Sequence, residues 1–128
     1  MTIALWCVMI GGLLPLAWTW YAKFTGDGFK PRHNYKPRDF LDTLEGARKR
    51  AHWAQLNSFE AFPPFAAAVL VATTVGRIDP ARLDQLAIAW VILRVLYGVL
   101  YIADRAPLRS LVWAAATACW VAIFVLSA

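Results

Sequence analysis

The stretch RAHWAQLNSFEAFPPFAAAVLVA, residues 50–72, carries a carboxylate into a long run of apolar residues. Glu60 is the only Asp, Glu, Lys or Arg between residues 51 and 76, and Pro63 and Pro64 follow it closely. An α-helix needs about 20 such residues to cross a hydrocarbon core of roughly 30 Å. A membrane β-strand would need only about ten residues and would alternate polar with apolar side chains. The stretch therefore predicts a membrane-spanning helix that carries a charge.

Three further apolar blocks and the overall composition agree with this prediction. Of the 128 residues, 60% are hydrophobic and 16% are charged, and the mean hydropathy is +0.51. A water-soluble domain of this size needs more polar residues to cover its surface. Because a backbone in lipid has to satisfy its own hydrogen bonds, the spanning segments are expected to be helices. We predict an all-α integral membrane protein, a single domain (1–128) built as a four-transmembrane-helix bundle, with helices at about 2–22, 47–76, 82–103 and 107–127 and a loop at about 23–46.

The first apolar block has a signal peptide as its alternative interpretation. No Lys or Arg precedes the block, and TWYAKF follows it in place of a small-residue cleavage site, so we expect a retained helix. Cys7 and Cys119 lie in apolar helices without a CxxC pattern or a histidine at ligand spacing. We therefore expect neither a disulfide nor a metal site from them, and interpret both as packing residues.

The basic residues are distributed unevenly between the two sides of the predicted bundle. The side opposite the first loop has only Arg77 and Arg82, and Arg94 lies inside a helix. The positive-inside rule then places both termini outside and the first and third loops in the cytoplasm. The net charge of +5 is explained by a basic face next to anionic lipid and does not require nucleic acid as a partner. The basic face comprises Lys23, Lys30, Arg32, Lys36, Arg38, Arg48, Lys49 and Arg50 in the first loop, and Arg105 and Arg109 in the third.

The first loop changes character partway along its length. Glycines and prolines break regular structure in its first half. From Asp39 onward, Phe40, Leu41 and Leu44 are helically spaced, with acidic residues early and basic residues late. We expect a short amphipathic helix at the membrane surface, with Asp39 as its N-cap.

Two charged residues, Glu60 and Arg94, fall at membrane depth. Such a charge costs roughly 2.5–3.5 kcal/mol on insertion scales, and these residues normally face the bundle interior or a wet cavity. At helical spacing, Arg50, Asn57 and Glu60 share one face of their helix, with Gln55 beside it. A second polar face, on the next helix, carries Arg94, Tyr97, Tyr101 and Arg105, and Arg109 lies one turn beyond.

Both polar faces run toward the basic side of the bundle. Together they predict an intramembrane site for a small ligand with several negative groups and one positive group, since guanidinium groups match carboxylates and Glu60 matches an amine. The alternative is an interhelical Glu60–Arg94 ion pair that only fixes packing. Pro63 and Pro64 remove hydrogen bonds to two carbonyls and predict a kink, which either shapes the site or is simply tolerated.

The same residues resemble the MAPEG family, the membrane-associated proteins in eicosanoid and glutathione metabolism. The family's second helix carries an Arg followed by an Ala-x-x-Asn-x-x-Glu-x-x-Pro-x-Phe pattern, matched here by Arg50, Ala54, Asn57, Glu60, Pro63 or Pro64, and Phe65. A second family region is matched by RVLYGVLYIADRAPLRS, which supplies Arg94, Tyr97, Tyr101, Arg109 and Ser110. The first-loop segment NYKPRDFLDTLEG, residues 34–46, resembles the bacterial branch.

The resemblance implies a homotrimer of four-helix subunits that bind glutathione as co-substrate at subunit interfaces, without a metal. It implies a glutathione transferase or peroxidase of the bacterial inner membrane that acts on lipophilic electrophiles or lipid hydroperoxides. By position, Arg109 is the residue that stabilises the glutathione thiolate, and Arg105 is the residue with which it could exchange roles. The residues that would bind the tripeptide are Arg50, Asn57, Glu60, Arg94, Tyr97, Tyr101 and Arg105.

Trp53 stands where characterised eicosanoid enzymes of the family usually have a second Arg, and Trp113 replaces a Tyr found in some members. These differences leave a non-catalytic member of the same fold as one alternative. A small multidrug-type transporter is another, but that class usually carries its Glu in the first helix, which has no Asp, Glu, Lys or Arg at positions 3–21 here.

Overall fold

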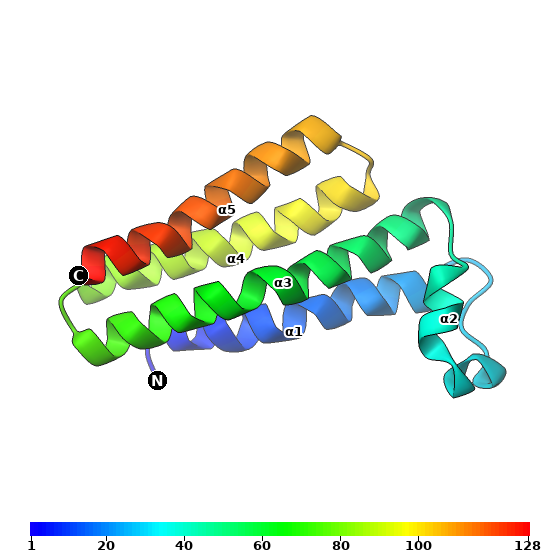
Figure 1. Cartoon of the computed structure of the whole chain (residues 1–128), viewed down its shortest axis with the longest axis horizontal. Helices are drawn as coiled ribbons and strands as arrows, with labels where there is room; N and C mark the ends of the chain where they lie inside the picture. The colour runs from blue at the N-terminus through cyan, green and yellow to red at the C-terminus, as the bar shows by residue number, and fades with distance from the viewer.

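The computed structural model describes residues 1–128 and contains only helices, four of them long. The long helices α1 (Ile3–Phe24), α3 (Gly46–Val75), α4 (Pro80–Ile102) and α5 (Ala106–Ser127) lie side by side along one axis (Figure 1). A short 3-10 helix, Pro31–Tyr35, and α2 (Pro37–Asp42) lie at one end of the bundle. We call this end the loop end, and the opposite end, where both termini lie, the far end. All four long helices are long and apolar enough to cross a membrane, as the sequence predicts.

The helix boundaries differ from the predicted ones by a few residues. α4 begins at Pro80, since proline suits the first helical position and the Asp79 carboxylate accepts a hydrogen bond of 3.0 Å from the Arg82 backbone N–H. Asp39 is not the N-cap of α2. That helix begins two residues earlier, at Pro37, so Asp39 lies in its first turn. α3 runs as one continuous helix through Pro63 and Pro64 and ends at Gly76, whose left-handed φ of 69° suits glycine.

The apolar core is divided into two clusters along the bundle axis. The larger cluster fills the far half, where the Phe65 and Trp90 rings stack with centroids 3.8 Å apart. Gly11 lets α1 approach closely here, because a Cβ at that position would lie 2.8 Å from the Trp90 ring. The smaller cluster lies at the loop end and consists of Ala22, Leu41, Leu44 and Ala51. Between the clusters, α3 and α4 bury polar side chains instead, including Ser58 and Arg94.

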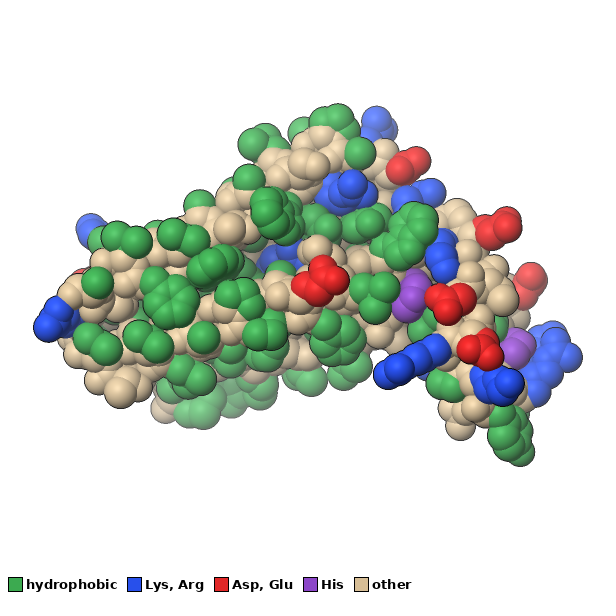
Figure 2. Space-filling model, in the orientation of Figure 1, with side chains coloured by type: hydrophobic (Ala, Val, Ile, Leu, Met, Phe, Trp, Pro, Cys, Tyr) green, Lys and Arg blue, Asp and Glu red, His purple; other side chains and the backbone are tan.

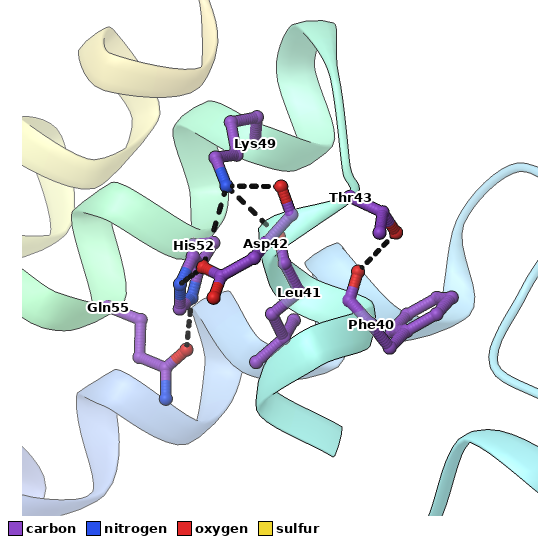
Figure 3. A network of polar contacts seen from close by, with 7 residues as sticks. All are labelled: Phe40, Leu41, Asp42, Thr43, Lys49, His52 and Gln55. Carbon is purple, nitrogen blue, oxygen red and sulfur yellow. Dashed lines mark hydrogen bonds and ion pairs between the residues drawn. The ribbon is translucent and has the colours of Figure 1, made fainter. Parts of the chain in front are cut away.

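The segment 25–45, which we call the lobe, is fastened to the first turns of α3 (Figure 3). Lys49 Nζ donates hydrogen bonds to the carbonyl oxygens of Leu41 (3.3 Å) and Asp42 (2.8 Å) at the end of α2. The Asp42 carboxylate lies 3.7 Å from Lys49 Nζ and 3.9 Å from His52 Nε2, and His52 Nδ1 lies 3.2 Å from Gln55 Oε1. These contacts hold the lobe against the bundle, next to the part of α3 that buries polar side chains.

The outer surface of the bundle is apolar over most of its length. Large hydrophobic side chains such as Leu16, Leu70, Ile92 and Leu111 are more than half exposed. Figure 2 shows hydrophobic side chains over the body of the bundle and charged ones gathered mainly over the loop end and the lobe. Water-soluble monomers rarely expose a continuous apolar surface of this extent, whereas lipid covers one at no cost. The helices, their length and this exterior describe a multi-pass integral membrane protein.

Candidate functional site

A hydrogen-bonded chain of three side chains crosses from α4 to α3 in the loop half of the bundle. Arg94 is only 1% exposed, and its Nη2 donates a hydrogen bond of 2.8 Å to Asn57 Oδ1. The Asn57 amide in turn donates to Glu60 Oε2 at 3.4 Å. Glu60 and Arg94 therefore do not form the direct ion pair considered as the alternative, because an amide group lies between them.

Arg94 keeps unused hydrogen-bonding capacity in this position. Its Nε is buried without a hydrogen-bond partner, and its guanidinium carbon lies 4.3 Å from the centroid of the Tyr97 ring. A guanidinium has five N–H donors, and a buried cation is expensive unless it is paired and fully hydrogen-bonded. The single side-chain acceptor supplied by Asn57 leaves this cation ready to interact with an added anionic group.

Aromatic rings and a second guanidinium continue the site toward the loop end. The Tyr97 and Tyr101 rings meet edge to face, with centroids 5.6 Å apart, and the Trp53 ring lies 6.3 Å from that of Tyr101. The guanidinium carbon of Arg109, at the start of α5, lies 4.1 Å from the centroid of the Tyr101 ring. Arg109 is half-buried. The cation–π contact therefore fixes a positive charge at the mouth of the site.

Two hollows flank Asn57 and Glu60. The first, between α3 and α4, has a volume of about 380 Å³, within the usual range for small-molecule sites. The second, between α3 and α5, has a volume of about 340 Å³. The first hollow is lined by Trp53, Leu56, Asn57, Glu60, Tyr97 and Tyr101. The second is lined by Asn57, Glu60, Ala61, Pro64, Trp113, Thr117 and Trp120. Asn57 and Glu60 thus border both hollows. The first hollow is lined by aromatic and polar side chains, and the second is more apolar.

Five predicted site residues gather here, namely Asn57, Glu60, Arg94, Tyr97 and Tyr101, and we call this group the polar seam. Arg109 joins it through its contact with Tyr101.

Two other predicted site residues, Arg50 and Arg105, do not belong to the polar seam, and like Arg94 and Arg109 they line neither hollow. Arg50 Nε donates a hydrogen bond of 3.0 Å to the Ile102 carbonyl, and so satisfies a free acceptor at the end of α4. Arg105 is exposed just before α5, and its side chain makes no hydrogen bond or ion pair within the chain.

The sequence reasoning missed the α5 residues of the second hollow. Trp113, Thr117 and Trp120 follow one another at spacings of four and three residues, which places them on one face of a helix. This helical spacing in the sequence is the signal that identifies them. Trp53, a difference from characterised family members, forms one wall of the first hollow.

One comparison with known proteins identifies the family of the chain. A model of the MAPEG family matches residues 3–128, which is nearly the whole chain. Neither the search of curated proteins nor the search of solved structures returned a match. The family match covers all four long helices and every residue of the polar seam. This chain is therefore a member of the MAPEG family, a multi-pass membrane protein of the group concerned with glutathione and eicosanoid metabolism.

Proposed function

We propose that the protein binds glutathione in the hollow between α3 and α4 and activates its thiol for attack on lipophilic electrophiles or lipid hydroperoxides. The observation that carries the proposal is the hydrogen-bonded chain Arg94–Asn57–Glu60 at the edge of that hollow. It offers a cation, an amide and a carboxylate in fixed order. Glutathione has two carboxylates, one ammonium group and two amide bonds, so its groups match this order of charges.

Arg109 is proposed to stabilise the thiolate. A free thiol has a pKa of about 8.5, and a nearby guanidinium lowers it because it favours the charged form. The stacking of Arg109 on Tyr101 holds its charge beside the hollow without neutralising it. The thiolate then forms a carbon–sulfur bond with an electrophile, and the electron pair leaves with the displaced group. With a hydroperoxide the thiolate attacks the terminal oxygen: a sulfur–oxygen bond forms, the oxygen–oxygen bond breaks, and the alcohol leaves after protonation. The resulting sulfenic acid then reacts with the thiol of a second glutathione, which gives the disulfide and water.

The lipophilic substrate is proposed to approach from the side of α5. The second hollow has an apolar wall that contains Trp113 and Trp120, and it shares Asn57 and Glu60 with the first. A substrate that enters from lipid would therefore meet the polar seam without crossing water. The proposal places glutathione entry on the basic loop end, facing the cytosol of a bacterium, with the protein in the inner membrane.

A homotrimer is proposed as the working assembly. Both hollows open on the surface of the single chain, and the surrounding helix faces are apolar and exposed. A neighbouring subunit would close them and exclude lipid from the bound tripeptide. Arg50 and Arg105 lie outside the hollows of their own chain, so in this proposal they contribute to glutathione binding only across a subunit interface.

One observation favours a second candidate function, a glutathione-binding protein without catalysis. Trp53 occupies a position where characterised eicosanoid enzymes usually have an Arg, and its ring stands against Tyr101 inside the hollow. A tryptophan there supplies packing but no positive charge.

Titration of glutathione into the purified protein in detergent, followed by thiolate absorbance, separates the candidates. The enzyme proposal expects binding with thiolate formation, which Arg109→Ala abolishes while glutathione still binds. Arg105→Ala is the matched comparison, since it removes the same charge from the same connection. It is expected to weaken glutathione binding at most and, at saturating glutathione, to leave the thiolate signal unchanged.

Other outcomes of this titration contradict the enzyme proposal. Binding without a thiolate in the unaltered protein would support the non-catalytic candidate. Absence of glutathione binding, together with proton-coupled efflux that depends on Glu60, would support a transporter instead.

A further inference from the structure

The lobe contains a hollow of its own, separate from the polar seam. Its volume is about 570 Å³, and it lies between the lobe and the start of α3. Cationic side chains line it together with carboxylates and an aromatic ring, namely Lys30, Arg32 and Arg48 with Asp27, Glu45 and Phe40. None of these residues lines either hollow beside the polar seam. The lobe hollow is therefore independent of the proposed glutathione site.

Arg48 is held in place on the wall of the lobe hollow. Its Nε donates a hydrogen bond of 2.9 Å to the Ala22 carbonyl, and its Nη2 lies 3.5 Å from the Lys23 carbonyl, both near the end of α1. Its guanidinium carbon also lies 5.7 Å from the centroid of the Phe40 ring. These bonds leave Nη1 uncommitted. A guanidinium fixed in this way loses little further conformational entropy when it binds a ligand.

His33 lies on the same wall and orients its neighbours. Its Nδ1 accepts a hydrogen bond of 2.9 Å from the Lys30 backbone N–H, and its ring stacks on Phe40 at 4.4 Å. Partial burial, followed by the nearby charges of Arg32 and Lys30, lowers the pKa of His33.

Arg32 is oriented by the same ring. Its Nε donates a hydrogen bond of 3.4 Å to His33 Nε2. Its two terminal nitrogens make no hydrogen bond within the chain, so they remain available to an anionic oxygen.

A row of aromatic rings connects the lobe hollow with the lipid-exposed surface of α1. Trp20 and Phe24, which are 65% and 53% exposed, lie on that surface with ring centroids 6.0 Å apart. Phe24 contacts Phe29 at 6.3 Å, and Phe29 contacts Phe40 in the hollow at 5.2 Å. An apolar path therefore leads from the membrane to the donors of the lobe.

We propose that the lobe hollow binds the headgroup of a phosphatidylethanolamine molecule from the adjoining leaflet. The phosphodiester lies against Arg32, Lys30 and the free Nη1 of Arg48, and an acyl chain follows Phe24 and Trp20. The carboxylates of Asp27 and Glu45 match the ammonium group of ethanolamine, which a phosphoglycerol headgroup lacks. The aromatic row favours a membrane lipid over a soluble phosphate, because a free phosphate has no acyl chain to contact these rings. The lipid would fasten the lobe to the membrane surface.

Native mass spectrometry of the full chain with added lipid tests this proposal. We expect phosphatidylethanolamine to bind more tightly than phosphatidylglycerol, and Arg32→Ala to weaken its binding about tenfold or more, since hydrogen bonds between charged groups are lost. Arg38→Ala is the matched control, because Arg38 is exposed on the same lobe, carries the same charge and does not line the hollow. Arg38→Ala is expected to change the affinity by less than about twofold.

Three results would overturn the proposal. Equal losses in Arg32→Ala and Arg38→Ala would show attraction to the general surface charge only. Equal affinity for phosphatidylethanolamine and phosphatidylglycerol would show that Asp27 and Glu45 do not recognise the ammonium group of ethanolamine. Binding of free phosphoethanolamine or inorganic phosphate as tight as that of the lipid, unaffected by Phe24→Ala, would show a site for a soluble anion. Thermal unfolding of each variant confirms that the lobe and bundle remain folded.

Discussion

The two halves of the bundle use the same four helices in opposite ways. In the far half, α3 and α4 meet through Phe65 stacked on Trp90. One turn farther along α4, in the loop half, the equivalent buried position is Arg94, and it meets Asn57 through a hydrogen bond. The far half fills its interior with apolar and small side chains, whereas the loop half buries charge. Packing in one half thus stabilises the fold, and the other half holds polar groups in positions useful for a ligand.

This division has a physical basis in the membrane environment. Lipid tails are as apolar as a leucine side chain, so helices in a bilayer are held together by close packing and hydrogen bonds rather than by the hydrophobic effect. Small residues permit close packing in the far half, where Ala68, Ala72 and Ala87 are fully or almost fully buried. The loop half lacks this close packing. It contains instead the cation of Arg94, which has no carboxylate partner, and two hollows that are open to the surface. Variants in the two halves should therefore affect different properties.

The largest expected effect comes from the far half. Trp90 is 2% exposed, stacks on Phe65 and packs closely against the backbone of α1 at Gly11. Trp90→Ala should lower the free energy of unfolding by about 3–5 kcal/mol, since it leaves a cavity in a tightly packed layer. Reversible unfolding in detergent micelles measures this loss. Glutathione affinity of the variant that remains folded should be unchanged, and a parallel loss of affinity would show that the two halves are not independent.

The next effect concerns the mouth of the proposed site. Arg109→Ala should lower kcat/KM for a lipophilic electrophile by about 100-fold or more, comparable with loss of one preorganised charge-stabilising donor. Steady-state kinetics with a chromogenic electrophile provides the measurement. Its stability should be nearly unaffected, because the Tyr101 contact is half-exposed. Similar rates for Arg109→Ala and Arg105→Ala would refute the assignment of the thiolate stabiliser to Arg109.

For the buried Arg94 we expect a smaller loss of binding and, unlike for Trp90→Ala, no loss of stability. Arg94→Met should weaken glutathione binding about tenfold, because a charged hydrogen bond to the ligand is lost. The free energy of unfolding should stay the same or rise, since exchanging a buried ion for an apolar side chain is often neutral or stabilising. Calorimetric binding and thermal unfolding on the same samples give both quantities. A large loss of stability together with unchanged affinity would make Arg94 a packing residue like Trp90.

The smallest effect is a local response to pH in the lobe. The pKa of His33 is lowered in the folded lobe, so the stabilisation from its neutral ring is present above the unfolded pKa of about 6.5 and is lost as the pH falls below it. Protonation turns Nδ1 into a donor and breaks its bond with the Lys30 N–H. The exchange protection factor of the Lys30 amide should therefore fall on acidification. His33→Gln should remove this pH dependence, and protection that falls equally in the variant would argue against it.

Helix length and periodicity made the bundle and the polar seam predictable. Apolar blocks of membrane-spanning length, bounded by Pro80 and Pro107, fix the helices to within a few residues. The 3.6-residue period places Asn57 on one helix face and Arg94 on another, and the 2.8 Å bond between them confirms that these two faces meet. Neither prediction needed any knowledge of tertiary contacts beyond the order of the helices.

Other features depend on contacts that no local pattern encodes. Arg50 shares a helix face with Asn57, yet its long side chain binds the Ile102 carbonyl, because the end of α4 happens to lie within its reach. The second hollow depends on how α5 lies beside α3, and so its α5 residues were missed. The aromatic row from Trp20 to Phe40 joins residues on α1, the lobe and α2, and only the folded lobe brings them together.

Recognition of glutathione by the charges of the polar seam can be tested with one ligand pair and one variant. Calorimetry compares glutathione with its analogue lacking the α-amino group, on the unaltered protein and on Glu60→Gln. We expect the unaltered protein to prefer glutathione by about tenfold, because Glu60 pairs with the ammonium group, and Glu60→Gln to lose this preference. Equal preference in both proteins, or no saturable binding in either, would contradict it.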